Sequence, residues 1–324
     1  MSENAQQRLL ITGANGFVGS HLIKAFLASF PEDAECIGWG LESFGNADER
    51  VSWHKVDLRD AECVDEAVLK AKPTVVVHLA AISHVPTSYA NPELVWDVNL
   101  LGTLRLLEAI QRHTPDAVVL VISSSEVYGR SFSSGIALDE QALLAPRTPY
   151  AVSKSAADLL AGQYAETGMQ VFRLRPFNHV GPRQSADFVV SAFASQIARI
   201  EKGLQEPVIN VGNLDAQRDF LHVKDVVSAY LEIIKNAGSL TPGEVFNVCS
   251  GIPRAIGGIL QDLLALSSVP ISVQQDESRM RPSDTPLAVG SAELLKSRLN
   301  WNPVISWEKT LQETLDYWRS SLTV

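Results

Sequence analysis

Tyr150 and Lys154 stand four residues apart in the segment Tyr150-Ala-Val-Ser-Lys154, directly after Pro149. Four residues are about one turn of an α-helix, so both side chains are expected on one helical face. A free phenol ionises near pH ~10, and a cation close by stabilises the phenolate and lowers its pKa. The pair therefore predicts a tyrosine whose pKa Lys154 lowers, able to exchange a proton with a carbonyl or hydroxyl oxygen.

The same spacing is also found in ordinary solvated surface pairs, so other parts of the sequence must decide between the two interpretations. Three glycines in Thr12-Gly-Ala-Asn-Gly-Phe-Val-Gly19 lie directly between an expected strand and an expected helix. Such glycines allow a tight turn and let the main chain approach a pyrophosphate, whose charge the N–H groups at the helix start stabilise. This turn predicts a dinucleotide site. The contacts expected from it are Gly13, Asn15, Gly16, Phe17 and Val18.

Later strand ends are expected to complete that site. Asp57 and Leu58 follow the third expected strand and are placed to meet the adenine end, while Leu79, Ala80 and Ala81 close the fourth strand beside the cofactor. The second strand ends in Gly38-Trp39-Gly40, which offers neither the acidic residue that holds a ribose diol nor an adjacent arginine for a 2′-phosphate. The choice between NAD and NADP stays open.

The elements that must position these residues alternate regularly up to residue 175. Short apolar runs predict strands, and amphipathic segments between them predict helices, which is the rhythm of a doubly wound parallel sheet, α/β in class. The expected strands are Arg8–Thr12, Glu35–Gly38, Val75–Leu79 and Ala117–Ser123. The expected helices are Ser20–Ser29, Ala61–Lys70, Pro92–Arg112 and Tyr150–Glu166, followed in a less regular second region by Asp187–Gly203, Ile256–Leu266, Ser291–Leu299 and Trp307–Ser320.

Composition excludes several classes of function. The 37 acidic and 27 basic side chains give a formal charge of −10, which opposes broad binding to nucleic acid or to an anionic membrane. Neither a secretory signal nor an apolar stretch of roughly 20 residues is found, so a cytoplasmic location is expected. Cys36, Cys63 and Cys249 lack the paired spacing of a metal or redox site and are expected to be reduced core thiols. No metal site is predicted.

Together these features resemble the extended short-chain dehydrogenase/reductase family, whose working parts are Gly-x-x-Gly-x-x-Gly, a Ser or Thr, and Tyr-x-x-x-Lys. The resemblance covers essentially the whole chain. Measured back from Tyr128-Gly129, it identifies Ser124 as the hydroxyl that polarises the reacting carbonyl, and Glu126 as the position where related dehydratases carry a carboxylate. Asn99 matches the family's structural asparagine and, with Pro176, is assigned to the cofactor site beside Tyr150 and Lys154.

Further segments are similar to the nucleotide-sugar members of that family: Arg175-Pro-Phe-Asn178-His179, Gln217-Arg218-Asp219-Phe220 and Arg281-Pro-Ser-Asp284. The resemblance implies that Arg218 and Arg281 hold a diphosphate, a role that suits a permanently charged fork. His179 is interpreted as a structural histidine. The substrate contacts implied are Ser83, His84, Ser124, Ser125, Glu126, Asn178, Phe188, Val189, Arg218 and Arg281.

The resemblance implies a Rossmann domain formed by residues 1–175 and 219–248, and a nucleotide-sugar domain formed by residues 176–218 and 249–324. It implies reduction of the C4 keto group of GDP-4-keto-6-deoxy-D-mannose to GDP-D-rhamnose, with NADP(H) or NAD(H) as cofactor and NADPH favoured. A GDP-mannose 4,6-dehydratase, in which Glu126 removes the C5 proton, is the first alternative. Another nucleotide-sugar epimerase or reductase and a catalytically silent dinucleotide sensor are the others. The helices at Pro92–Arg112 and Tyr150–Glu166 are expected to form a homodimer contact.

Overall fold

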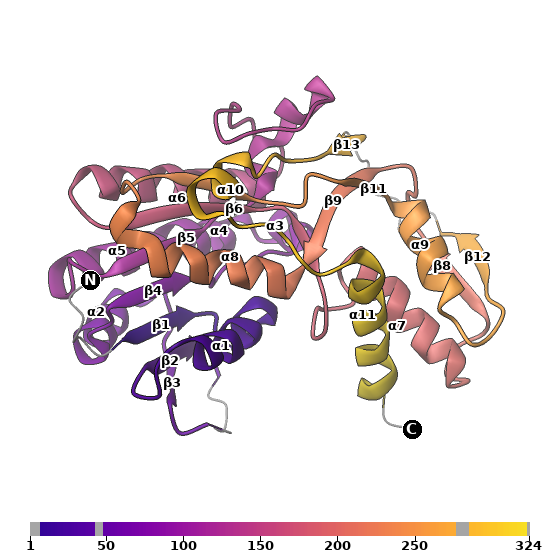
Figure 1. Cartoon of the computed structure of the whole chain (residues 1–324), viewed down its shortest axis with the longest axis horizontal. Helices are drawn as coiled ribbons and strands as arrows, with labels where there is room; N and C mark the ends of the chain where they lie inside the picture. The colour runs from indigo at the N-terminus through magenta and orange to yellow at the C-terminus, as the bar shows by residue number, and fades with distance from the viewer. Residues whose placement is uncertain (1–6, 43–47, 277–284, 323–324) are drawn as a thin grey trace.

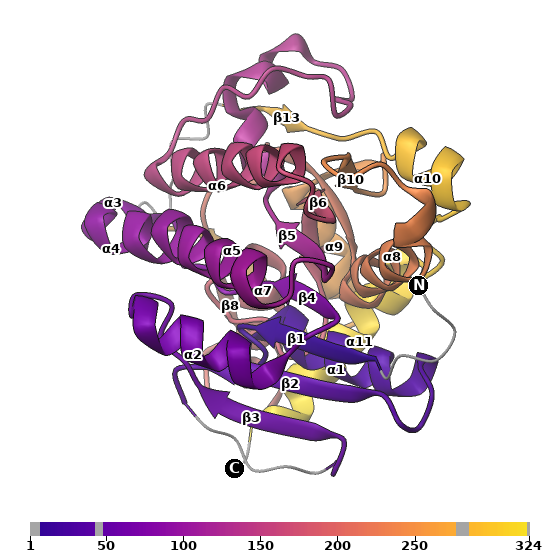
Figure 2. The ribbon, with the colours of Figure 1, turned by 90° about the vertical axis from the view of Figure 1, so that its left-hand side faces the viewer.

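Seven parallel strands form the main sheet of the computed structural model, which describes residues 7–42, 48–276 and 285–322 (Figures 1 and 2). Their order across the sheet is β10-β6-β5-β4-β1-β2-β3, so the chain starts in the middle and winds outward in both directions. The strands are β1 Arg8–Thr12, β2 Glu35–Gly40, β3 Val51–Lys55, β4 Val75–His78, β5 Val118–Ile122, β6 Val171–Pro176 and β10 Val245–Val248. The predicted α/β class is confirmed.

The central strands are apolar along their whole length because helices cover both faces of the sheet. Successive side chains of a strand point to opposite faces. Leu9 and Ile11 therefore pack with α1 and α8, while Leu10 and Val76 pack with α2, α5 and α6 (Figure 2). The helices of these two layers are α1 Phe17–Ser29 and α8 Val223–Asn236 on one face, and α2 Ala61–Ala71, α5 Gly102–His113 and α6 Pro149–Glu166 on the other.

One expected helix is more complex than the sequence indicates. The segment predicted as a single helix over Pro92–Arg112 consists of α4 Pro92–Trp96, a π-helical turn η1 Asp97–Leu101, and α5. A π turn widens the helix by one residue and is frequently found at functional sites. The short helix α3 Val85–Ala90 precedes it, between β4 and α4.

The remaining elements form a second lobe beside the carboxyl ends of the sheet, on the right of Figure 1. Strand β9 pairs with β7, β11 and β13, β8 pairs with β12, and three helices pack together over a separate apolar core. The strands are β7 Asn178–Val180, β8 Val208–Val211, β9 Gln217–His222, β11 Pro253–Ala255, β12 Ser272–Gln275 and β13 Leu287–Ala288. The helices of this core are α7 Val189–Glu201, α9 Ile256–Ala265 and α11 Trp307–Ser321.

Three smaller elements complete the fold. The 3₁₀ segment η2 Ser125–Ser134 follows β5, and η3 Ala237–Ser239 follows α8. Helix α10 Glu293–Leu299 returns to the main sheet and packs beside α8 and β10. All three cysteines are free thiols, with Cys36 and Cys249 buried and Cys63 half-buried. Within the described part of the chain, none of the helices has the length and apolar character that crossing a bilayer requires.

Candidate active site

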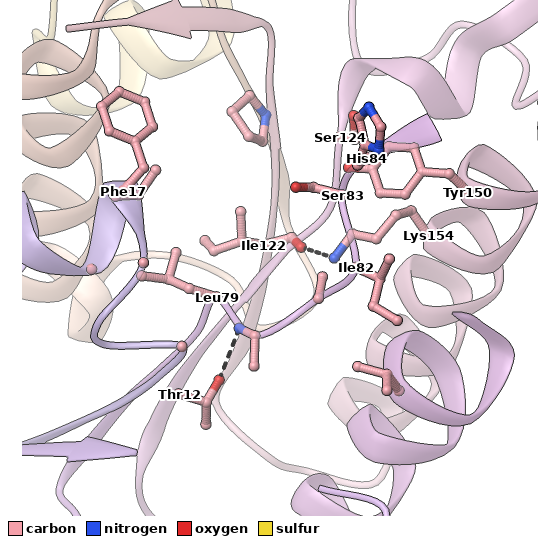
Figure 3. Close-up of a pocket in the computed structure, with 18 of the residues that line it drawn as sticks. Thr12, Phe17, Leu79, Ile82, Ser83, His84, Ile122, Ser124, Tyr150 and Lys154 are labelled. Carbon is pink, nitrogen blue, oxygen red and sulfur yellow. Dashed lines mark hydrogen bonds between the residues drawn. The ribbon is translucent and has the colours of Figure 1, made fainter. Parts of the chain in front are cut away.

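A cavity of about 770 Å³ opens at the carboxyl ends of the central strands (Figure 3). Its size lies within the range of small-molecule and cofactor sites. Most residues predicted from the sequence line this single cavity: Gly13, Asn15, Gly16, Phe17, Val18, Asp57, Leu58, Leu79, Ala80, Ala81, Ser83, His84, Ser124, Ser125, Glu126, Tyr150, Lys154, Pro176, Asn178, Phe188 and Val189. Asn99 and Arg218 lie outside its lining. Arg281 falls outside the described residues.

The glycine turn brings two strand ends close together at one end of the cavity. Gly13 has a φ of +67°, and a Cβ placed there would lie 3.0 Å from both N and Cα of Ala80. A Cβ at Gly19 would lie 2.6 Å from the carbonyl oxygen of Ala14. Gly16 precedes α1 and gives it no side-chain cap, which leaves the N–H groups of the first turn for an anion.

A buried hydrogen-bond chain fixes the cavity floor behind that turn. The Thr103 hydroxyl donates to the Asn99 carbonyl at 2.7 Å, so its oxygen accepts from Nε2–H of His78 at 2.9 Å. Nδ1 of His78 then accepts from the Thr12 hydroxyl at 2.7 Å, and Thr12 accepts from the Ala80 N–H at 3.1 Å. Burial lowers the pKa of His78 to about 3, with Lys154 acting in the same direction, so this imidazole is neutral at physiological pH.

Asn99 connects the cavity wall to the helix that carries Tyr150. Its Oδ1 accepts from the Ile82 N–H at 2.8 Å, and its Nδ2 donates to the Ile82 carbonyl at 3.1 Å and to the Ser153 hydroxyl at 3.0 Å. The side chain is 1% exposed and belongs to the π turn η1. Asn99 therefore holds α6 and the loop after β4 in place, from behind the wall of the cavity.

Tyr150 and Lys154 lie on the first turns of α6 and both reach the cavity (Figure 3). The Thr148 hydroxyl caps this helix by accepting from the Ala151 N–H at 3.0 Å, and Pro149 occupies its first position. Tyr150 is hydrogen-bonded to the Ser124 side chain, which comes from the end of β5. Lys154 donates from Nζ to the Ile122 carbonyl in the same strand end.

The predicted lowering of the Tyr150 pKa by Lys154 is wrong for this structure. Burial raises the pKa of Tyr150 to about 12, the hydrogen bond from Ser124 opposes the rise, and the charge of Glu126 adds to it. Burial also lowers the pKa of Lys154 to about 8, against the attraction of Asp158. With Tyr150 only 9% and Lys154 only 4% exposed, removal from water outweighs the pairing that the helical spacing predicts.

The phenol is therefore in its protonated form at neutral pH, and that is the form that can give a proton away. The site as it stands is suited to protonating an oxygen that gains negative charge next to Tyr150 and Ser124. Extracting a proton with the same phenol requires a further stabilisation of the phenolate that the protein alone does not supply.

Glu126 adds a second titratable group close to Ser124. Its N–H donates to the Ser124 hydroxyl at 3.2 Å, and its side chain opens onto the cavity. The surrounding walls raise the pKa of Glu126, while the charge of Arg218 lowers it. Arg218, on β9, donates from Nη1 to the Gln217 and Thr285 carbonyls at 2.8 Å each. The fold thus brings together Glu126 and Arg218, which are far apart in the sequence.

The opposite wall of the cavity comes from the second lobe. Asn178 donates from Nδ2 to the Asp219 carbonyl at 3.3 Å, and Phe188 and Val189 form the start of α7, where both stay partly exposed to the cavity. His179 also lines the cavity, where its ring stacks on Phe17 at 5.8 Å with 7° between the planes. That stack joins the glycine turn to the second lobe.

Sequence reasoning missed several lining residues, among them Trp39, Arg59, Gln184 and Tyr230. Arg59 forms a bidentate ion pair with Asp57, at 2.6 Å for its closest contact, and its position next to Asp57 and Leu58 in the segment after β3 was an available signal. Tyr230 comes from the middle of α8, and no local motif marks it. Among the residues that the structure describes, no group of three His, Cys, Asp or Glu side chains lies close enough together to hold a metal ion.

Comparisons with known proteins show which proteins the whole chain is similar to. The family model described as GDP-mannose 4,6 dehydratase matches residues 10–314. The chain is 37% identical over 315 residues to GDP-6-deoxy-D-mannose reductase of Pseudomonas aeruginosa, covering 97% of this chain and 98% of that protein. The solved structure of RMD from Pseudomonas aeruginosa complexed with NADPH superposes with a TM-score of 0.84 at 35% identity, over 98% of this chain and 100% of that one. Human GDP-mannose 4,6 dehydratase is 28% identical over 94% of this chain and 89% of its own length.

Proposed function

The chain belongs to the GDP-mannose 4,6-dehydratase family of the extended short-chain dehydrogenases/reductases, and on that basis we propose that it is an NAD(P)H-dependent reductase of a nucleotide sugar. The proposed reaction converts the C4 keto group of GDP-4-keto-6-deoxy-D-mannose into the hydroxyl of GDP-D-rhamnose. The observation that carries the proposal is the convergence of protonated Tyr150 and Ser124 on a cavity whose far end is the glycine turn. The similarity to the Pseudomonas aeruginosa reductase over the full length supports the choice of substrate.

The cavity fits a nicotinamide dinucleotide in shape and polarity. Gly13 and Gly19 allow such close backbone approach that a Cβ would overlap the main chain of Ala80 or Ala14. The start of α1 offers N–H groups to a pyrophosphate. Asp57 and Leu58 would lie at the adenine end, and Pro176 with Leu79 at the nicotinamide end. The reduced form of the coenzyme supplies a hydride when bound.

The residues of the chain itself handle the proton and the charge. Tyr150 donates its phenolic proton to the C4 oxygen, and the Ser124 hydroxyl hydrogen-bonds the same oxygen as negative charge develops there. Lys154, held by the Ile122 carbonyl, lines the cavity one helical turn from Tyr150 and is assigned to aligning the coenzyme ribose. Of the chain's own hydroxyls, Tyr150 is therefore the acid and Ser124 the orienting partner.

The sugar nucleotide is proposed to extend toward the second lobe. Asn178 and Phe188 line the cavity with an amide and an aromatic ring. Arg218, outside the lining but close enough for its charge to act on Glu126, is assigned to the diphosphate. Ser83 and His84 follow β4 on the hexose side, where His84 is oriented by a contact of 3.0 Å between Nδ1 and the Thr87 hydroxyl.

The expected homodimer has a surface that suits it. Tyr89 on α3 and Leu159 on α6 are each 61% exposed, and Leu101 in η1 is 41% exposed. These elements contact one another, so the three apolar side chains lie on neighbouring helices. We assign this surface to the contact between two copies of the chain, and sedimentation velocity measures whether Leu159→Glu dissociates them.

A dehydratase is the second candidate, because one observation favours it. Glu126 opens onto the cavity beside Ser124, and the cavity walls around it raise its pKa while the charge of Arg218 lowers it. In that reaction Glu126 would take the C5 proton once C4 is a ketone and deliver it to the C6 hydroxyl, which leaves as water. The hydride removed from C4 would end on C6, so the coenzyme would show no net change.

One assay separates the two candidates. Purified protein is incubated either with GDP-mannose or with the 4-keto sugar plus NADPH or NADH, and the nicotinamide absorbance and product masses are recorded. The reductase consumes one reduced coenzyme per keto sugar; the dehydratase removes water from GDP-mannose with no net consumption. Tyr150→Phe should lower turnover by ~10²–10⁴ without loss of folding. The proposal is contradicted if the wild type shows neither of the two activities, or if Tyr150→Phe keeps full activity.

A further inference from the structure

Tyr230 is a buried tyrosine of α8 whose side chain lines the cavity but has no role in the reaction described above. It is 0% exposed, and its hydroxyl has no hydrogen-bond partner among the residues that the structure describes. Nearly all buried polar groups in proteins are hydrogen-bonded, so an unpartnered hydroxyl on a residue of the cavity lining is a candidate to receive its partner from the bound ligand.

The position of Tyr230 relative to Tyr150 narrows the choice of ligand group. Helix α8, which carries Tyr230, covers one face of the main sheet, and α6, which carries Tyr150, covers the other (Figure 2). They are close enough that the charge of one opposes ionisation of the other. A flat group lying across the strand ends would therefore meet Tyr150 on its reacting side and Tyr230 on the other.

The surroundings of the hydroxyl favour a neutral acceptor over an anion. Tyr230 belongs to an apolar core cluster that also contains Ile122, Phe172 and Val248, and burial strongly raises its pKa, so the phenol stays neutral and acts as a donor. The charged phosphates of a dinucleotide would bind at the glycine turn, at the other end of the cavity. A neutral amide carbonyl is therefore the acceptor that suits the position next to Tyr230.

We propose that the Tyr230 hydroxyl donates a hydrogen bond to the carboxamide oxygen of the nicotinamide, on the side away from Tyr150, and thereby orients the ring. This inference rests on the proposed function, because it requires a nicotinamide coenzyme in the cavity. It assigns to α8 a positioning contact that neither the glycine turn nor the Tyr150 helix contains.

The test uses Tyr230→Phe, which removes the hydroxyl and keeps the ring. Isothermal titration calorimetry measures the affinity of the full chain for oxidised NADP, or for NAD if the wild type prefers it, and for the analogue with an unsubstituted pyridinium ring. Loss of one neutral hydrogen bond should weaken coenzyme binding about 3- to 10-fold, while binding of the analogue, which has no carboxamide, should not change.

Tyr164→Phe is the matched control, because Tyr164 is a buried tyrosine of α6 outside the cavity lining. It should leave the affinity for both ligands unchanged. The inference is overturned if Tyr230→Phe binds the coenzyme as tightly as the wild type. It is also overturned if the affinity for the analogue falls by the same factor as the affinity for the coenzyme, because the hydroxyl then contributes to packing or binds a water molecule. A wild type that binds no nicotinamide dinucleotide overturns the proposed function as well, and the wild-type titration alone shows this.

Discussion

Replacing Lys154 by Met should change the free energy of unfolding of the coenzyme-free protein in a way that depends on pH. The difference between variant and wild type should be more favourable to the variant at pH 7 than at pH 10, although Lys154 belongs to the active site. Lys154 is 4% exposed, and burial lowers its pKa from 10.5 to about 8. A lysine whose pKa is lowered by folding costs stability when it is charged. That cost is fully present below about pH 8 and disappears as the pH rises through 10.5.

The magnitude follows from the two pKa values. At about 1.4 kcal/mol per pH unit, the charged side chain costs the folded protein about 3 kcal/mol at neutral pH and about 1 kcal/mol at pH 10. Met fills a similar volume without the charge, but it leaves the Ile122 carbonyl without this donor, at a cost of about 1–3 kcal/mol that does not depend on pH. The gain of the variant over wild type should therefore shrink by about 2 kcal/mol between pH 7 and pH 10.

Urea unfolding of both proteins at a series of pH values, after removal of any bound coenzyme, measures this difference. Lys70→Met is the control, because Lys70 is exposed and forms a surface ion pair with Glu66 at 2.8 Å. It should show no comparable dependence on pH. A free-energy difference between Lys154→Met and wild type that stays flat over this range, or grows with pH, would refute the assignment of a desolvated cation beneath Tyr150.

Three further changes test other parts of the site. Asn99→Ala removes three hydrogen bonds between the loop at Ile82 and α6, and urea unfolding should show a loss of about 1–3 kcal/mol; an unchanged midpoint would mean that the amide does not hold these elements together. Asp158→Asn leaves the buried guanidinium of Arg175 without its bidentate partner, at 2.9 and 3.0 Å, and should cost about 3–5 kcal/mol, whereas a loss below about 1 kcal/mol would contradict a structural ion pair. Arg218→Met should raise the KM for the nucleotide sugar ~10-fold or more with the coenzyme affinity unchanged in calorimetry, and an unaltered KM would remove Arg218 from the substrate site.

The sequence predicted the parts of the site that depend on local geometry. The strand, glycine turn and helix around Gly13 are consecutive in the chain, so their arrangement follows from their order. The shared face of Tyr150 and Lys154 follows from the period of the helix. The strand ends at Leu79 and Pro176 meet at one edge because parallel strands align their carboxyl ends.

The parts that failed depend on the tertiary environment. The pKa of Tyr150 is set by how much water the completed fold removes, and no spacing rule contains that quantity. The π turn that carries Asn99 arises where α4 and α5 pack on α6, and the apolar pattern predicts an uninterrupted helix there. Tyr230 joins the cavity only because α8 returns to the first lobe after β9 has paired in the second.

The protonation states of the site are those with which a reduction begins. A reduction ends with a proton moving to the substrate oxygen, so the tyrosine must begin protonated, and Tyr150 meets this requirement at physiological pH both at its ordinary pKa of 10 and at its raised pKa of about 12. An oxidation must begin by placing the proton of the substrate hydroxyl on a phenolate, which the buried site disfavours by about two pH units relative to a free tyrosine. Glu126 does not relieve that cost, because its charge raises the pKa of Tyr150 further. Desolvation therefore leaves Tyr150 neutral and able to donate, but as a weaker acid than a free tyrosine, and the hydrogen bond with Ser124 is the contact that opposes this weakening.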